Sequence, residues 1–183
     1  MYKRQILLRA VQTRQLTPGR LVIMPSALHR RPSRHRLERI VLGAARAGAV
    51  PGLDRALSHA ARMAFRPQAG EGLSARGNPS ARDLVRHAFA DVGGDGNRAR
   101  AWARFARAWP AGADRDLLDR YGAIDAPILL LWADRDAVHP LEPAREALDL
   151  LPDAQLRVLS GTGFLMAYDD PVGVARELKA FCG

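Results

Sequence analysis

Apolar residues near the two ends of the chain switch between short continuous runs and helical spacing. The runs at 21–24 and 128–132 predict strands buried on both faces of a parallel sheet, and residues 156–159 predict a third strand. In three further segments the apolar residues recur at the spacing of an amphipathic helix: 6–15, 141–151 and 172–181. Strands that alternate with helices form parallel sheets, so the pattern predicts an α/β fold with a partial parallel sheet.

The middle of the chain, residues 29–121, has the pattern of helices alone. Its apolar residues keep helical spacing in segments separated by stretches rich in Gly, Ser and Pro. Residues 67–79 predict a mobile loop, and Ser80 is predicted to be the N-cap of the helix that follows. We interpret 29–121 as a helical lid inserted between two strands of the sheet. A separate helical domain is the alternative, but it would need stronger linkers than the sequence provides.

The first residues of the chain look foreign to the rest. Residues 2–5 are similar to what a sequencing-library adaptor encodes, so 1–5 are predicted to be a non-native scar. A native basic N-terminus is the alternative. We expect the strand–helix–strand unit to which 6–15 belongs to start upstream of Met1. The predicted α/β core is then made of two segments, 6–28 and 122–183, on either side of the lid.

The net charge of +9 does not by itself indicate a nucleic-acid partner. Of the 28 basic residues 26 are arginines, which are spread from Arg4 to Arg176 and often lie near an acidic residue. This bias is typical of a GC-rich genome, and the sequence has no basic stripe with interleaved aromatic residues. We therefore expect the protein not to bind nucleic acid.

Composition places the chain among globular proteins that do not span a membrane. Its 183 residues, 48% of them apolar, are enough for one domain with a real core. No run approaches the roughly 18–20 apolar residues of a membrane span, and the N-terminus lacks the apolar core of a signal peptide. We expect a cytoplasmic protein with no membrane partner. The single cysteine, Cys182, excludes an internal disulfide and a cysteine-based zinc site.

Two carboxylates follow the predicted strand 128–132 directly. In an open parallel sheet, active groups lie just beyond the carboxyl ends of the strands, which is where Asp134 and Asp136 are expected. On the residues alone, they could equally cap the following helix or bind Arg135 or Arg145. The position of these two carboxylates therefore indicates a candidate site without deciding its chemistry.

Two segments resemble parts of the α/β-hydrolase family. Residues 132–140, Trp-Ala-Asp-Arg-Asp-Ala-Val-His-Pro, resemble its acid-bearing loop. Residues 152–171 are similar to its last strand, its Gly-x-Gly-His turn and the start of its closing helix. The resemblance covers 6–28 and 122–182 but hardly the helical lid. It implies that the sheet holds the last three strands of such a fold.

The resemblance also assigns catalytic positions. It implies that Asp136 is the acid, whose role is to orient a histidine and stabilise its charged form. Phe164 occupies the position of that histidine, and a phenyl ring transfers no proton at any pH. The nucleophile elbow, Gly-x-Ser-x-Gly, is implied to lie upstream of Met1, since no serine of the chain has that context.

Two other histidines are alternative bases. His139 lies three residues after Asp136 on the same predicted loop, and His29 follows the first predicted strand. Both could equally be ordinary surface or loop residues. No His-x-x-x-His or Glu-x-x-His pair is present, and no glycine-rich phosphate loop precedes a helix. The sequence therefore predicts no metal and no cofactor.

The expected function follows from the resemblance. The parent protein is predicted to hydrolyse small apolar ester-like substrates, and this chain is predicted to be an inactive C-terminal fragment of it. Aromatic residues of the lid could line the substrate pocket, or lie in the lid's own core: Trp102, Phe105 and Trp109. The alternative is a degenerate hydrolase-like protein that binds a small molecule without catalysis. The sequence does not predict an oligomeric state.

Overall fold

The computed structural model describes residues 3–25, 72–94, 97–98, 101 and 120–183. The chain divides into two compact units, of which the first comprises Met1–Arg30, Gly72–Ala81 and Gly112–Gly183. The second comprises Arg31–Glu71 and Arg82–Ala111. The segment Gly72–Ala81, predicted as part of the lid, therefore belongs to the same unit as the sheet.

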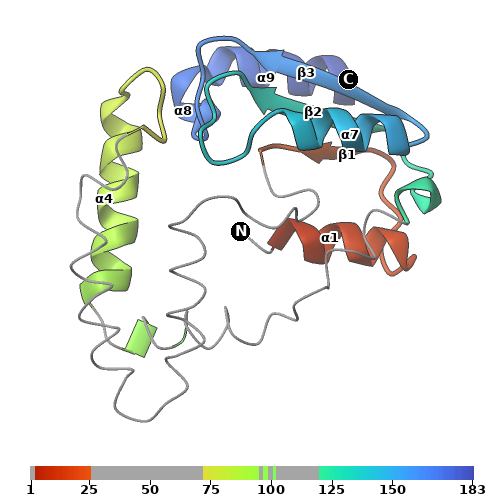
Figure 1. Cartoon of the computed structure of the whole chain (residues 1–183), viewed down its shortest axis with the longest axis horizontal. Helices are drawn as coiled ribbons and strands as arrows, with labels where there is room; N and C mark the ends of the chain where they lie inside the picture. The colour runs from red at the N-terminus through yellow and green to blue at the C-terminus, as the bar shows by residue number, and fades with distance from the viewer. Residues whose placement is uncertain (1–2, 26–71, 95–96, 99–100, 102–119) are drawn as a thin grey trace. The chain divides into compact units, whose positions relative to one another are not determined.

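The first unit is built on a parallel three-stranded sheet (Figure 1). Its strands are β1 (Leu21–Ile23), β2 (Ile128–Ala133) and β3 (Ala154–Leu159), in that order across the sheet. Both pairs are parallel, with Leu21 opposite Ile128 and Leu130 opposite Leu156. The predicted α/β fold with a partial parallel sheet is confirmed, although β3 begins two residues earlier than the apolar run indicated.

Helices flank the sheet on both sides. They are α1 (Lys3–Gln12), α7 (Glu142–Leu150), α8 (Met166–Asp169) and α9 (Pro171–Cys182), with the 3-10 turn η2 (Tyr121–Ala123) before β2. Helix α4 (Pro79–Gly94) begins in the first unit and continues into the second. The helical segments predicted between residues 29 and 66 lie outside the described residues, and so does Trp102 with the residues that follow it up to 119.

Helix α1 differs from the prediction at both ends. It begins at Lys3, so residues that were predicted to be a foreign scar form its first turn. It ends at Gln12 because Arg14 adopts a left-handed backbone conformation, with φ of 57°. Its buried face is formed by Leu8 and Val11, whereas the neighbouring Leu7 is exposed.

Ser80 is not the N-cap of α4, contrary to the prediction. The side chain of Asn78 takes that role, because its Oδ1 accepts from the N–H groups of Ser80 at 2.9 Å and Ala81 at 3.4 Å. Pro79 is the first helical residue, where its missing N–H costs nothing. Helix α9 starts in the same way, with the Asp170 carboxylate as cap ahead of a proline.

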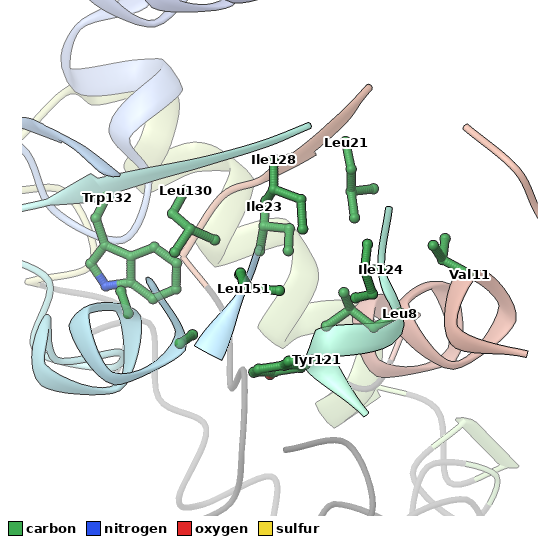
Figure 2. Packing of buried hydrophobic residues seen from close by; sticks show 12 residues of the cluster. Leu8, Val11, Leu21, Ile23, Tyr121, Ile124, Ile128, Leu130, Trp132 and Leu151 are labelled. Atoms are coloured by element: carbon green, nitrogen blue, oxygen red, sulfur yellow. The ribbon is translucent and has the colours of Figure 1, made fainter. Parts of the chain in front are cut away.

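Two hydrophobic clusters cover the two faces of the sheet. Along β2, Ile128, Leu130 and Trp132 point to one face, where they meet residues from α1, η2 and α7 (Figure 2). Leu129, Leu131 and Ala133 point to the other face and pack against residues from α8 and α9. All six side chains are at most 3% exposed, so β2 is the central strand of a helix–sheet–helix sandwich.

Candidate active site

The loop that follows β2 holds Asp136 in a fixed orientation. Its Oδ1 accepts from the backbone N–H groups of Val138 at 2.7 Å and His139 at 2.9 Å. The carboxylate side chain is fully buried. It does not cap α7, whose N-cap is Leu141, and it forms no ion pair with Arg135 or Arg145 within the described part of the chain. The structural alternatives for Asp136 that the sequence left open are therefore excluded.

Three predicted site residues come together at this loop, two from the loop itself and one from the turn after β3. The second carboxylate oxygen of Asp136, Oδ2, lies 3.6 Å from Nδ1 of His139. The ring of His139 packs against the ring of Phe164, with 5.2 Å between centroids and 32° between planes. Phe164, from the turn after β3, thus lies beside the loop after β2 that carries Asp136 and His139 (the acid loop). The candidate site is this cluster of Asp136, His139 and Phe164.

Trp132 fixes the backbone at the far end of the acid loop. Its side chain is fully buried on β2, and its Nε1–H donates to the carbonyl oxygen of His139 at 2.9 Å. The indole therefore connects the core in Figure 2 to the loop that carries both Asp136 and His139.

We expect Trp132→Phe to lower the free energy of unfolding by roughly 2 kcal/mol, because it leaves the His139 carbonyl unpaired and a small void in the core. Leu131→Met, on the opposite face of β2, keeps the side-chain volume and should cost under about 1 kcal/mol. Urea unfolding followed by circular dichroism compares the two variants. Equal stability of Trp132→Phe and the wild type would show that this hydrogen bond does not hold the loop.

Asp134 fastens the acid loop to the turn after β3. Its carboxylate accepts from the Ser160 hydroxyl at 3.1 Å and from the Thr162 N–H at 3.2 Å. The pKa of Asp134 is lowered, chiefly by the backbone N–H of Gly161 and further by those two donors. Gly161 itself has φ of 67°, a conformation that favours glycine. The carboxylate of Asp134 is therefore a structural clamp, separate from that of Asp136.

Asp169 forms a second clamp, which the sequence did not reveal. Its buried carboxylate accepts from the Ser74 hydroxyl and from the N–H groups of Gly163 at 2.8 Å, Ala75 at 2.9 Å and Arg76 at 3.3 Å. Burial alone would raise the pKa of Asp169, but these hydrogen bonds outweigh it and the net pKa is lowered. Asp169 therefore ties the segment around Ser74 to the turn that carries Phe164.

The remaining predicted site residues are not placed. His29, Trp102, Phe105 and Trp109 lie outside the described residues. His87 is exposed on α4, with Nδ1 at 2.7 Å from the carbonyl oxygen of Asp83. Within the ranges that the structure describes, no group of three or more His, Cys, Asp or Glu side chains could hold a metal ion.

Solved structures with a similar fold include α/β-hydrolase fold proteins. An α/β-hydrolase fold protein from Burkholderia ambifaria matches with a TM-score of 0.72 and 18% identity, over 97% of this chain and 62% of its own. The 2-hydroxy-6-oxo-6-phenylhexa-2,4-dienoate hydrolase of Rhodococcus sp. strain RHA1 gives 0.67 and 17%, over 97% and 60%. A thermophilic esterase from Thermogutta terrifontis gives 0.64 and 18%, over 97% and 60%. The chain therefore has the α/β-hydrolase fold and spans its C-terminal part.

The chain corresponds to only part of these solved structures. No protein-family model matches the sequence, and no curated protein is similar to it. The chain spans between 53% and 62% of the length of the solved structures that it resembles. None of the described helices is long and apolar enough to cross a lipid bilayer.

Proposed function

We propose that this chain is the C-terminal part of an α/β hydrolase whose whole form cleaves small apolar ester-like substrates. The observation that carries the proposal is Asp136, a buried carboxylate just beyond the central strand and beside the turn of Phe164. Solved structures of similar fold include an esterase and a 2-hydroxy-6-oxo-6-phenylhexa-2,4-dienoate hydrolase, which supports the same general class. In this proposal the lid at 29–121 supplies the substrate pocket through Trp102, Phe105 and Trp109.

The chemistry of the site explains why the chain alone is proposed to be inactive. Acyl transfer in this fold needs a nucleophile, a histidine that moves the proton and an acid that orients the histidine. Asp136 meets the requirement for the acid. Phe164 cannot move a proton, and Ser74, the one serine close to a buried carboxylate in the described residues, is bound to Asp169 rather than to a histidine.

We expect the purified chain to hydrolyse p-nitrophenyl acetate and p-nitrophenyl butyrate no faster than buffer. The reason is that no serine of the chain has an elbow context and residue 164 carries no base. The rate is measured from the yellow p-nitrophenolate that is released. Hydrolysis above buffer that disappears in Phe164→Ala would contradict inactivity of the chain and place the chemistry at this cluster.

A second candidate is a hydrolase-like binding protein that kept a pocket and lost the reaction. The packing of the Phe164 ring on His139 favours it, because an apolar ring stands where the family has its base. The two candidates differ at the nucleophile of a longer form of the protein. Labelling of that form by a fluorophosphonate supports the hydrolase, whereas ligand binding without labelling supports the binding protein.

A further inference from the structure

His139 is a buried imidazole with unused hydrogen-bonding capacity. Its side chain is 8% exposed, and neither Nδ1 nor Nε2 has a hydrogen-bond partner among the residues that the structure describes. Oδ2 of Asp136 is buried and without a hydrogen-bond partner in the same part of the chain. Burying polar atoms without partners is costly, so two such groups facing one another need an explanation.

The geometry favours one tautomer of the ring. Oδ1 of Asp136 already accepts from two backbone N–H groups, which leaves Oδ2 as the oxygen that can pair with Nδ1 of His139, 3.6 Å away. A carboxylate only accepts, so the neutral imidazole can pair with it only if Nδ1 carries the proton. The distance of 3.6 Å is longer than a hydrogen bond, as is common for such pairs before a substrate is bound. In that tautomer Nε2 keeps its lone pair.

We infer that His139 is the base of this site and replaces the histidine that position 164 lacks. Asp136 orients the ring through Nδ1, and Nε2 accepts the proton of an attacking hydroxyl group or water and returns it to the leaving group. Phe164 is a positioning residue, because its ring packs on the imidazole and restricts its rotation. This inference rests on the proposed function for its chemical meaning, but the tautomer that it requires is measured without any substrate.

The tautomer is read from long-range proton–nitrogen correlation spectra of the chain labelled with nitrogen-15 histidine. Loss of one signal in His139→Gln assigns His139 among the 5 histidines. We expect the wild-type ring to carry its proton on Nδ1. In Asp136→Asn, the amide oxygen can keep the two backbone hydrogen bonds and the NH2 group then faces Nδ1. That exchange should lower the ratio of the Nδ1–H to the Nε2–H tautomer by about tenfold or more, the scale of one charge-assisted hydrogen bond.

Two controls accompany this measurement. His87, whose Nδ1 contacts the Asp83 carbonyl on exposed α4, should keep its tautomer in Asp136→Asn. Phe164→Leu should leave the tautomer of His139 unchanged, because it removes the ring contact but no charge. A wild-type ring protonated on Nε2 overturns the inference, and so does a ratio that Asp136→Asn leaves unchanged. If Asp136→Asn does not fold, the wild-type spectrum alone still decides. An active or inactive chain in the ester assay changes neither outcome, so the two proposals fail separately.

Discussion

Replacing Asp169 with Asn is expected to lower the free energy of unfolding by about 3 kcal/mol. Asp169 is 6% exposed, and its carboxylate accepts hydrogen bonds from a hydroxyl and three backbone N–H groups of two separate segments. An amide has one acceptor oxygen in place of two and adds a donor that faces other donors. At least one buried N–H therefore loses its partner, and the segment around Ser74 loosens from the turn around Gly163.

Urea unfolding measures this change, and the next residue supplies a matched control. Asp170→Asn retains an N-cap for α9, where the present carboxylate accepts from Gly173 N–H at 2.9 Å. Because Asn and Asp cap helices about equally well, this control should change stability by less than about 0.5 kcal/mol. If the two variants are equally stable, Asp169 is not the clamp that its contacts indicate.

The stability difference between the wild type and Asp169→Asn should also depend on pH. The pKa of Asp169 is lowered from its ordinary value of 3.8, so the carboxylate binds its proton less readily in the folded state than in the unfolded state. Its contribution is therefore complete above pH 3.8 and is lost as the pH falls through the lower folded value. The stability difference between the wild type and Asp169→Asn should be constant near neutral pH and shrink in that acid range.

The second large effect is expected for Gly163→Ala, which should cost about 2–3 kcal/mol. A Cβ at this glycine would lie 2.8 Å from the carbonyl oxygen of Leu73 and 2.9 Å from the backbone nitrogen of Ala75. Both are backbone atoms, which cannot turn away as the end of a flexible side chain does. The two segments must then separate, and the hydrogen bond from Leu165 N–H to Leu73 O at 2.8 Å is strained with them.

Gly122→Ala is the matched control for Gly163→Ala. A Cβ at Gly122 meets no atom within 4 Å, and the residue does not have a positive φ. Thermal or urea unfolding should show the control near the wild type and Gly163→Ala clearly below it. Backbone amide signals of Ala75 and Leu165 should move only in Gly163→Ala. Equal stability of both variants would mean that the close approach at Gly163 relaxes without cost.

The strand β2 and the loop after it could be predicted, because each is determined by residues that are close together in the sequence. The continuous apolar run of β2 indicated a strand buried on both faces, and its six buried side chains confirm it. The acid loop is likewise local, since Asp136 and His139 are three residues apart. Spacing alone could not decide which of two adjacent leucines in α1 faces the core. Neighbouring residues of a helix are only about 100° apart around its axis, so both lie near the edge of the apolar face. Leu8 rather than Leu7 is buried because it packs against η2 and the sheet.

Contacts between distant segments were beyond the sequence pattern. Asp169 and Ala75 are separated by 94 positions, and the sequence around either residue does not indicate that the two are in contact. One signal for Asp169 was available in the sequence. Two acidic residues, Asp169 and Asp170, precede Pro171, and only one of them is needed to cap the helix that follows, so the other is free for a different role. The prediction of Ser80 as the N-cap of α4 is wrong for a local reason instead. Ser80 and Asn78 are both good caps, and Pro79 at the first helical position decides between them.

The two clamps formed by Asp134 and Asp169 have a consequence for substitutions at position 164. The turn after β3 is shaped by Asp134, Asp169 and two glycines, and none of these contacts involves the side chain of residue 164. The contacts that shape this turn therefore do not depend on which side chain residue 164 carries. A substitution at position 164 is therefore expected to change the contact with the ring of His139 while the turn itself persists.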